Sequence, residues 1–220
     1  MFRSLIFDMD GVLIDSEPVY ERVELGIHRE LGTDMDAKKR LKYVGTPTRE
    51  MWTQVKAKYG LEESVDFLVE LEKQRMFEAI YGRKENDAIK GVVPLVEEMK
   101  EKGIKMAVAS SSAKDDILSV VKSIGIDEYM EFLVSSNQVE RGKPEPDVFL
   151  FTAETMGVKP NECLVIEDSR QGVTAALKAG MKCIGFDQDN KGTQDLSIAN
   201  IVVDDISDID YKLINALFNE

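Results

Sequence analysis

Long apolar runs are absent from this sequence of 220 residues. No stretch approaches the roughly 18 apolar residues that a membrane-spanning helix requires. The first residues carry one positive charge and reach Asp8 too early for the apolar core of a secretory signal. We therefore expect a cytoplasmic protein with no membrane partner.

Cysteine and histidine are nearly absent, which disfavours sites built from sulfur or imidazole ligands. Cys163 and Cys183 each lie inside an apolar run, and we expect both to be buried free thiols. His28 is the only histidine. It follows the apolar Ile27 in a helical pattern, and we expect a structural role for it.

Positive charge is in deficit: 28 lysines and arginines face 41 aspartates and glutamates, for a net charge of −13. This balance repels nucleic acid, which we therefore exclude as a partner. It also repels phosphorylated compounds, so a phosphate site would need local positive charge from a metal ion and a few cationic side chains. The hydrophobic fraction of 43% is sufficient for a buried core.

Residues 17–81 contain helical patterns only. One apolar face recurs every four residues and consists of Val19, Val23, Ile27 and Leu31. Gly32 is expected to end this helix, and Ser64 is expected to cap a later one. We expect Met51 and Trp52 in the core of an all-helical domain over residues 15–82.

The remainder of the chain alternates between short β-branched runs and helical patterns, after a first strand over 2–7. Strands are expected over 104–109, 132–135, 163–167, 182–186 and 200–203, with helices over 92–102, 114–124, 146–156 and 171–179. This alternation favours a parallel sheet covered on both faces. The sequence therefore predicts an α/β core, residues 1–14 and 83–220, with the helical cap inserted after the first strand.

Polar side chains follow several of the predicted strands, where ligands bind in open parallel sheets. Asp8 and Asp10 follow the first strand and, two residues apart, can face the same way. Ser110 ends the next strand of the core, and the pair Glu167-Asp168 ends a later one. Lys143 lies between them in a turn with two prolines.

Carboxylates, hydroxyls with free amides and one ammonium together suit phosphoryl transfer. Clustered carboxylates favour a hard cation, and Mg²⁺ fits best. One carboxylate can attack phosphorus, and a second can protonate the leaving oxygen. The lysine and the amides can neutralise the charge of the transferring group.

Four segments, in this order, resemble the ordered motifs of the haloacid dehalogenase superfamily. They are Asp8-x-Asp10-Gly-Val, the strand-ending Ser110, Gly-Lys143-Pro-x-Pro-Asp and Glu167-Asp168-Ser169. The helical block after the first segment is similar to the subgroup with a helical cap, which contains β-phosphoglucomutase and many sugar-phosphate phosphatases. The resemblance implies a Rossmann-like core and covers the whole chain.

The resemblance also implies a role for each matching residue. Asp8 is then the nucleophile and Asp10 the general acid and base. Mg²⁺ is held by the Asp8 carboxylate, the Asp10 carbonyl and Asp168, with Glu167 supporting it from close by.

Phosphate binding is assigned by the same resemblance to Ser110, the backbone of Ser111 and Lys143. An acid at position 10 favours phosphatases and mutases over dehalogenases. The implied substrate is a small phosphorylated metabolite, acted on by a protein that is most simply a monomer.

The cap contributes candidate substrate contacts. The segment around Gly45 and Arg49 resembles a substrate-specificity loop. In such a loop Gly45 would let the backbone approach the site, and Arg49 would clamp a second anionic group. Tyr20 stands where β-phosphoglucomutases carry a histidine, which favours a phosphatase. Lys73 and Arg75 are weaker candidates on a helix face.

Simpler readings remain open for most of these residues. An Asp-x-Asp-Gly run is often a turn. Ser111, Ser112 and Ser169 can cap the helices that follow them, and Lys143 can be a solvated surface lysine. The leading hypothesis is a phosphatase, with a phosphoglucomutase-like isomerase and a catalytically silent binding protein as alternatives.

Overall fold

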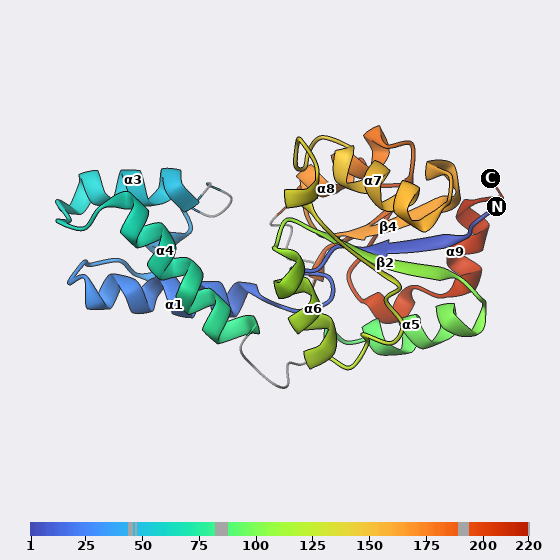
Figure 1. The fold of residues 1–220 in the computed structure, drawn as a ribbon, viewed down its shortest axis with the longest axis horizontal. Helices are drawn as coiled ribbons and strands as arrows, with labels where there is room; N and C mark the ends of the chain where they lie inside the picture. The colour runs from blue at the N-terminus through green and yellow to red at the C-terminus, as the bar shows by residue number, and fades with distance from the viewer. Residues whose placement is uncertain (44–45, 47, 82–87, 189–193, 220) are drawn as a thin grey trace. The chain divides into compact units, whose positions relative to one another are not determined.

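The computed structural model describes residues 1–43, 46, 48–81, 88–188 and 194–219 (Figure 1). The chain divides into two compact units. One consists of Met1–Asp15 and Lys84–Glu220, and the other of Ser16–Arg83. Each of the two boundaries between these units lies one residue later in the chain than the boundary expected from the ranges 1–14, 15–82 and 83–220.

The first unit contains a six-stranded parallel sheet, counted over the described residues, in the order β3-β2-β1-β4-β5-β6. The strands are β1 (Ser4–Phe7), β2 (Lys105–Ser110), β3 (Phe132–Ser135), β4 (Cys163–Glu167), β5 (Lys182–Phe186) and β6 (Ile201–Val203). The predicted α/β class and the position of every predicted strand are confirmed.

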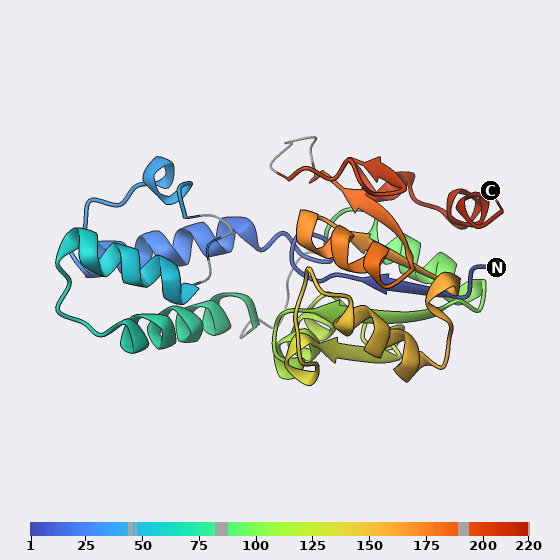
Figure 2. The ribbon, with the colours of Figure 1, turned by 90° about the horizontal axis from the view of Figure 1, so that it is seen from above.

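Helices cover both faces of this sheet (Figure 1; Figure 2). They are α5 (Val92–Glu101), α6 (Lys114–Ser123), α7 (Asp147–Met156), α8 (Arg170–Lys178) and α9 (Tyr211–Leu217). On one face, Phe149 of α7 and Val173 of α8 pack against Ile6 and Val165 of the strands. Because side chains alternate along a strand, Leu5 and Phe7 point to the other face.

Helix α9 was not predicted. It spans only seven residues, too few for a clear periodic pattern. Asp210 caps it by accepting a hydrogen bond from the Leu213 amide (2.6 Å), and Ile214 and Leu217 are buried.

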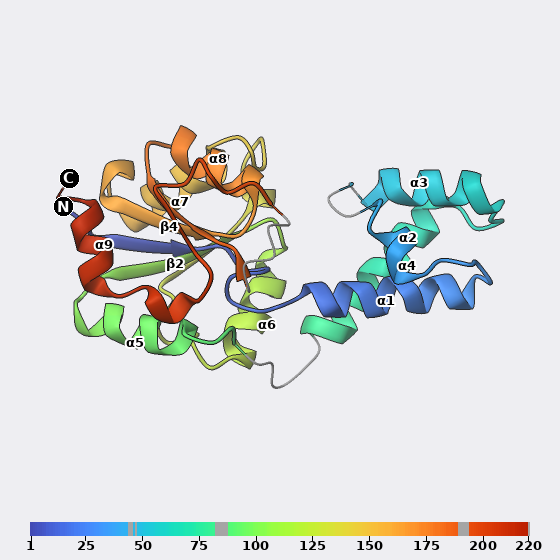
Figure 3. The ribbon, with the colours of Figure 1, turned by 180° about the vertical axis from the view of Figure 1, so that it is seen from behind.

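The second unit contains helices in its described part: α1 (Glu17–Glu30), α2 (Ala37–Arg40), α3 (Thr48–Tyr59), α4 (Val65–Met76) and the π-helical turn η1 (Phe77–Tyr81) (Figure 3). As predicted, Met51 and Trp52 are buried in its core. The Ser64 hydroxyl caps α4 by accepting from the Phe67 amide (3.2 Å), which confirms that prediction too.

The histidine and the cysteines also take the expected places. His28 is buried and forms a hydrogen bond with Thr33 (2.9 Å), and its ring contacts the Trp52 ring in a tilted arrangement. Cys163 and Cys183 are buried free thiols. No helix in the described part of the chain has both the length and the apolar character needed to cross a membrane.

Candidate active site

The central strand β1 delivers Asp8 to the carboxyl edge of the sheet. Phe7 pairs with Val108 of β2 on one side and with Ile166 of β4 on the other. The Asp8 amide continues this ladder by donating to the Ile166 carbonyl (3.0 Å). Asp8 therefore lies between the ends of β2 and β4, and its side chain is almost completely buried.

A tight turn follows Asp8. Gly11 has a φ of +80°, and its amide donates to the Ile14 carbonyl (2.8 Å). A Cβ atom at position 11 would collide with the Asp168 carboxylate. Because glycine leaves this space open, Asp168 lies directly against the backbone of the turn that carries Asp10.

Lys143 is buried in the same site, so the reading of this residue as a solvated surface lysine is wrong. Its side chain is 7% exposed. The ammonium donates to Asp8 Oδ1, to Glu167 Oε1 (2.5 Å) and to the Ala109 carbonyl (3.3 Å). Lys143 thus joins the ends of β1, β2 and β4.

Both oxygens of Glu167 are occupied by protein groups. Oε1 accepts from Lys143, and Oε2 accepts from the Ser169 amide and hydroxyl (2.9 Å each). The absence of a side chain at Gly172 makes room for this carboxylate, because a Cβ atom there would overlap it. Glu167 therefore orients Lys143, and Gly172 is a supporting residue that sequence reasoning missed.

The serines after β2 divide into different roles. Ser110 is buried and accepts a hydrogen bond from the Ser112 amide (3.0 Å), whereas Ser111 is exposed. The Ser112 hydroxyl donates to Asp10 Oδ2 (3.3 Å). Ala113, not Ser111 or Ser112, occupies the N-cap of α6, so the capping reading of these serines is wrong. Ser169 does cap α8 and accepts from the Gly172 amide (3.0 Å).

Negative charge outweighs positive charge in this buried site. Burial raises the pKa of Asp8 to about 7, although Lys143 opposes the shift. Burial, followed by the charges of Asp8 and Glu167, raises the pKa of Asp168 to about 8. Burial alone would lower the pKa of Lys143, but the Asp8 and Glu167 carboxylates outweigh it and raise this pKa above its usual value.

This donor set fits a hard divalent cation. Carboxylate and carbonyl oxygens are the ligands that Mg²⁺ prefers, and a second positive charge would offset the excess of carboxylates. Within the described residues, no group of three or more histidine, cysteine or acidic side chains forms a ready-made metal cluster. The fit therefore depends on Asp8 and Asp168 with the backbone of the Asp10 turn, because Glu167 is already bound by Lys143 and Ser169.

Comparison with known proteins identifies the family. Residues 5–186 match the haloacid dehalogenase-like hydrolase family. The chain belongs to the haloacid dehalogenase-like hydrolases.

Relatives of this hydrolase include named phosphatases. A phosphorylated carbohydrates phosphatase from Thermotoga maritima is 33% identical over 185 residues, which is 83% of each protein. The chloroplastic protein SUPPRESSOR OF QUENCHING 1 from Arabidopsis thaliana is 35% identical over 186 residues, but the match covers 82% of this chain and only 17% of that protein. The chain is therefore an enzyme of the phosphatase type.

Solved structures share its fold. A β-phosphoglucomutase from Clostridium difficile superposes with a TM-score of 0.80 at 26% identity, covering 100% of this chain and 98% of that one. A hydrolase of the same family from Deinococcus radiodurans, solved with bound phosphate and sodium, also gives 0.80 at 26% identity and covers 99% and 97% of the two chains.

Two of the three cap residues proposed for this hydrolase, Arg49 and Tyr20, lie among the described residues and have different surroundings. Arg49 is exposed and forms an ion pair with Asp66 (2.6 Å). Tyr20 instead lines a separate pocket in the helical unit. Gly45 lies outside the described residues.

Proposed function

We propose that this enzyme removes phosphate from a small phosphorylated sugar or related metabolite through an aspartyl-phosphate on Asp8, with Mg²⁺ as its cofactor. The state of the Asp8 carboxylate is the observation that carries this proposal. Lys143 holds Oδ1, while Oδ2 has no hydrogen-bond partner among the residues that the structure describes. One oxygen is fixed and the other is available to attack phosphorus.

In the first step, Asp8 Oδ2 attacks phosphorus and the ester bond to the leaving oxygen breaks. Asp10, two residues further along the turn, donates its proton to that oxygen, so a neutral alcohol departs. The Ser112 hydroxyl hydrogen-bonds the Asp10 carboxyl and orients it. Lys143 offsets charge at the reacting carboxylate, and the Ser110 hydroxyl with the Ser111 amide suits the phosphoryl oxygens.

In the second step, water attacks the phosphorus of the aspartyl-phosphate. Asp10 accepts the proton of this water, the bond from phosphorus to Asp8 breaks, and inorganic phosphate leaves. Asp8, the Asp10 backbone and Asp168 would hold Mg²⁺. When bound, the ion supplies charge neutralisation for the phosphoryl group.

A second candidate is a phosphoglucomutase-like isomerase, which returns the phosphoryl group to the sugar instead of to water. The structural likeness to a β-phosphoglucomutase favours it. The 33% identity to a phosphorylated carbohydrates phosphatase, together with Tyr20 in place of the expected histidine, favours the phosphatase.

The deciding experiment measures phosphate release with Mg²⁺ from a panel of sugar phosphates and nucleotides. We expect release from a restricted group of sugar phosphates, abolished by EDTA. β-Glucose 1-phosphate with a bisphosphate primer, followed by NMR, tests the isomerase. Conversion to glucose 6-phosphate with little free phosphate would overturn the phosphatase proposal.

The Asp8→Asn variant tests the nucleophile. We expect phosphate release to fall by about 10³-fold or more, because an amide cannot form the intermediate. Asp127→Asn, at an exposed position of the same unit, is the matched control and should keep full activity. Phosphate release by Asp8→Asn at the wild-type rate would exclude an aspartyl-phosphate intermediate on Asp8.

A further inference from the structure

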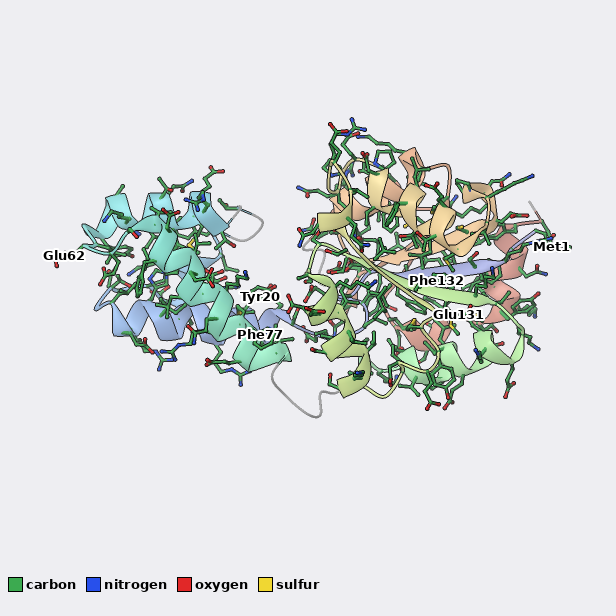
Figure 4. The ribbon with its side chains drawn as sticks, in the orientation of Figure 1. Met1, Tyr20, Glu62, Phe77, Glu131 and Phe132 are labelled. Atoms are coloured by element: carbon green, nitrogen blue, oxygen red, sulfur yellow. The ribbon has the colours of Figure 1, made fainter. Side chains whose placement is uncertain are left out.

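Ser135 lies beside the turn after β2 that contributes serines to the core site. β3, the strand next to β2, begins at Phe132 (Figure 4) and ends at Ser135. Ser135 pairs in register with Ser110, the last residue of β2. Because the two strands are parallel and end together, the Ser135 side chain is within reach of the residues that follow Ser110.

The Ser135 side chain is buried, and its hydroxyl has a partner on each side. The residue is 1% exposed. Its hydroxyl donates to the Ser112 carbonyl (2.6 Å) and accepts from the Asn137 amide (3.1 Å). A hydroxyl has one proton to donate, so the proton of Ser135 is committed to Ser112.

Ser112 connects this contact to two groups of the core site. Its amide donates to the Ser110 hydroxyl (3.0 Å), and its own hydroxyl donates to Asp10 Oδ2 (3.3 Å). Ser110 accepts this bond and keeps its own proton for a phosphoryl oxygen. The Ser111 amide lies between residues 110 and 112, so the same contacts set its direction.

The Ser112 carbonyl lies outside the hydrogen-bond ladder of α6. Ala113 is the N-cap of this helix, and its carbonyl accepts from the Ile117 amide (3.0 Å). The carbonyl of the preceding residue therefore needs a partner from elsewhere in the fold, and Ser135 supplies one. This hydrogen bond ties the turn after β2 to the end of β3.

Ser135 also has a local role as the N-cap of the 3₁₀ turn η2 (Ser136–Gln138). It forms a capping box with Gln138, whose Oε1 accepts from the Ser135 amide (2.9 Å). Capping requires a side-chain oxygen that accepts a hydrogen bond. The proton that Ser135 donates to Ser112 is not needed for the cap, so the two roles can be separated by mutation.

We propose that Ser135 is a positioning residue for phosphoryl transfer: its hydroxyl holds the Ser112 backbone and, through it, the Ser110 hydroxyl and the Asp10 carboxyl. The proposal rests on the proposed function, in which Asp10 protonates the leaving oxygen. Ser135 itself touches no reacting atom. Its loss should therefore matter most for substrates whose leaving group needs a proton.

Ser135→Ala tests this expectation with two substrates, a sugar phosphate that the enzyme hydrolyses and p-nitrophenyl phosphate. The nitrophenolate ion is a stable leaving group that needs little help from an acid. We expect kcat/KM to fall about thirtyfold for the sugar phosphate and only about threefold for p-nitrophenyl phosphate, because both substrates use Ser110 but only the first depends on Asp10 as an acid. An equal loss with both substrates would indicate a purely structural role and overturn the proposal.

Two further variants assign the effect to the contact with Ser112. Gln138→Ala breaks the capping box but keeps the Ser135 hydroxyl, so it should match the wild type with both substrates. In a Ser112→Ala background, Ser135→Ala should change the ratio of the two kcat/KM values by less than about twofold, because the hydroxyl that orients Asp10 is already absent. If Gln138→Ala reproduces the loss, or if Ser135→Ala has its full effect without the Ser112 hydroxyl, the proposal fails.

Crystal structures of the wild type and of Ser135→Ala test the positioning without an activity. We expect the Ser112 hydroxyl to move more than about 3.5 Å from Asp10 Oδ2 in the variant, beyond hydrogen-bond distance. An intact contact between Ser112 and Asp10 would overturn the proposal. If the wild type releases phosphate from no compound and the variant still loses this contact, the proposed function fails while the positioning of Ser112 by Ser135 stands.

Discussion

Lys143 is the residue on which the electrostatics of the core site depend. It is a buried cation that donates to both Asp8 and Glu167. Removing one partner of a buried ion pair leaves uncompensated charge and typically costs about 3–5 kcal/mol. We expect Lys143→Met to lower the free energy of unfolding by about this amount, measured by urea denaturation with circular dichroism in EDTA.

Lys178→Met is the control for that variant. Lys178 forms an ion pair with Glu145 (2.9 Å), but both side chains are more than a third exposed. Its loss should cost less than about 1 kcal/mol. Equal stability of Lys143→Met and Lys178→Met would show that Lys143 does not balance the buried carboxylates.

Glu72 gives the stability of the protein a specific pH dependence. Burial raises its pKa from 4.5 to about 7, although the Trp52 hydrogen bond opposes the shift. Between these values the unfolded chain loses the proton first, so the contribution of Glu72 to stability falls as the pH rises from 4.5 to 7. Above pH 7 the full cost of burying the ionised Glu72 carboxylate is reached, and it lowers the free energy of unfolding by at most about 3 kcal/mol.

Glu72→Gln should therefore stabilise the protein at pH 8 by about 1–3 kcal/mol, and less at pH 5. Urea denaturation followed by the fluorescence of Trp52 measures this difference. Glu70→Gln, the same change at an exposed position of α4, should change the free energy of unfolding by less than about 0.5 kcal/mol at both values. A loss of stability in Glu72→Gln that is the same at pH 5 and pH 8 would contradict the assigned pKa.

At the scale of the element, the turn after β1 holds two parts of the site together. Gly11 needs a positive φ, and its missing side chain leaves space for Asp168. Gly103, after α5, also has a positive φ (+69°), but a Cβ atom there would meet nothing within 4 Å. Alanine substitutions at the two glycines therefore distinguish the cost of a strained backbone from the effect of crowding Asp168.

We expect Gly103→Ala to cost about 1–2 kcal/mol of stability, as alanine does in the left-handed region. Gly11→Ala should cost more, and it should also lower phosphate release at least tenfold, because Asp168 must move. Urea denaturation and the phosphate assay measure the two effects. Wild-type activity in Gly11→Ala would mean that the position of Asp168 is not critical.

The elements of the sheet could be predicted from sequence because each strand is a short buried run followed by polar residues. Asp8, Ser110 and Glu167 lie at strand ends, so parallel register alone brings them to one edge. The contacts of Arg40 and Glu72 could not be predicted in this way. Each joins helices far apart in sequence, 16 residues for Arg40 with Glu24 and 20 for Glu72 with Trp52, and helical periodicity carries no information on such pairs.

At the scale of the whole molecule, the net charge of −13 makes every cation attractive. A general effect of Mg²⁺ on surface charge must therefore be separated from binding at the Asp8 site. A ligand that binds only the folded state at a hundred times its Kd adds about 2.7 kcal/mol of stability. For a chain of this size that corresponds to a rise in Tm of about 5–10 °C.

We expect Mg²⁺ to raise the Tm by several degrees relative to NaCl of equal ionic strength, as measured by differential scanning calorimetry. Asp168→Asn should abolish the rise, because it removes a carboxylate that lies against the backbone of the Asp10 turn. Asp127→Asn changes the net charge by the same amount at an exposed position, and this variant should keep the rise in Tm with Mg²⁺. If both variants respond to Mg²⁺ as the wild type does, the ion acts through the overall charge of the molecule. A response lost only in Asp168→Asn assigns the ion to the carboxyl edge of the sheet, beside the proposed nucleophile.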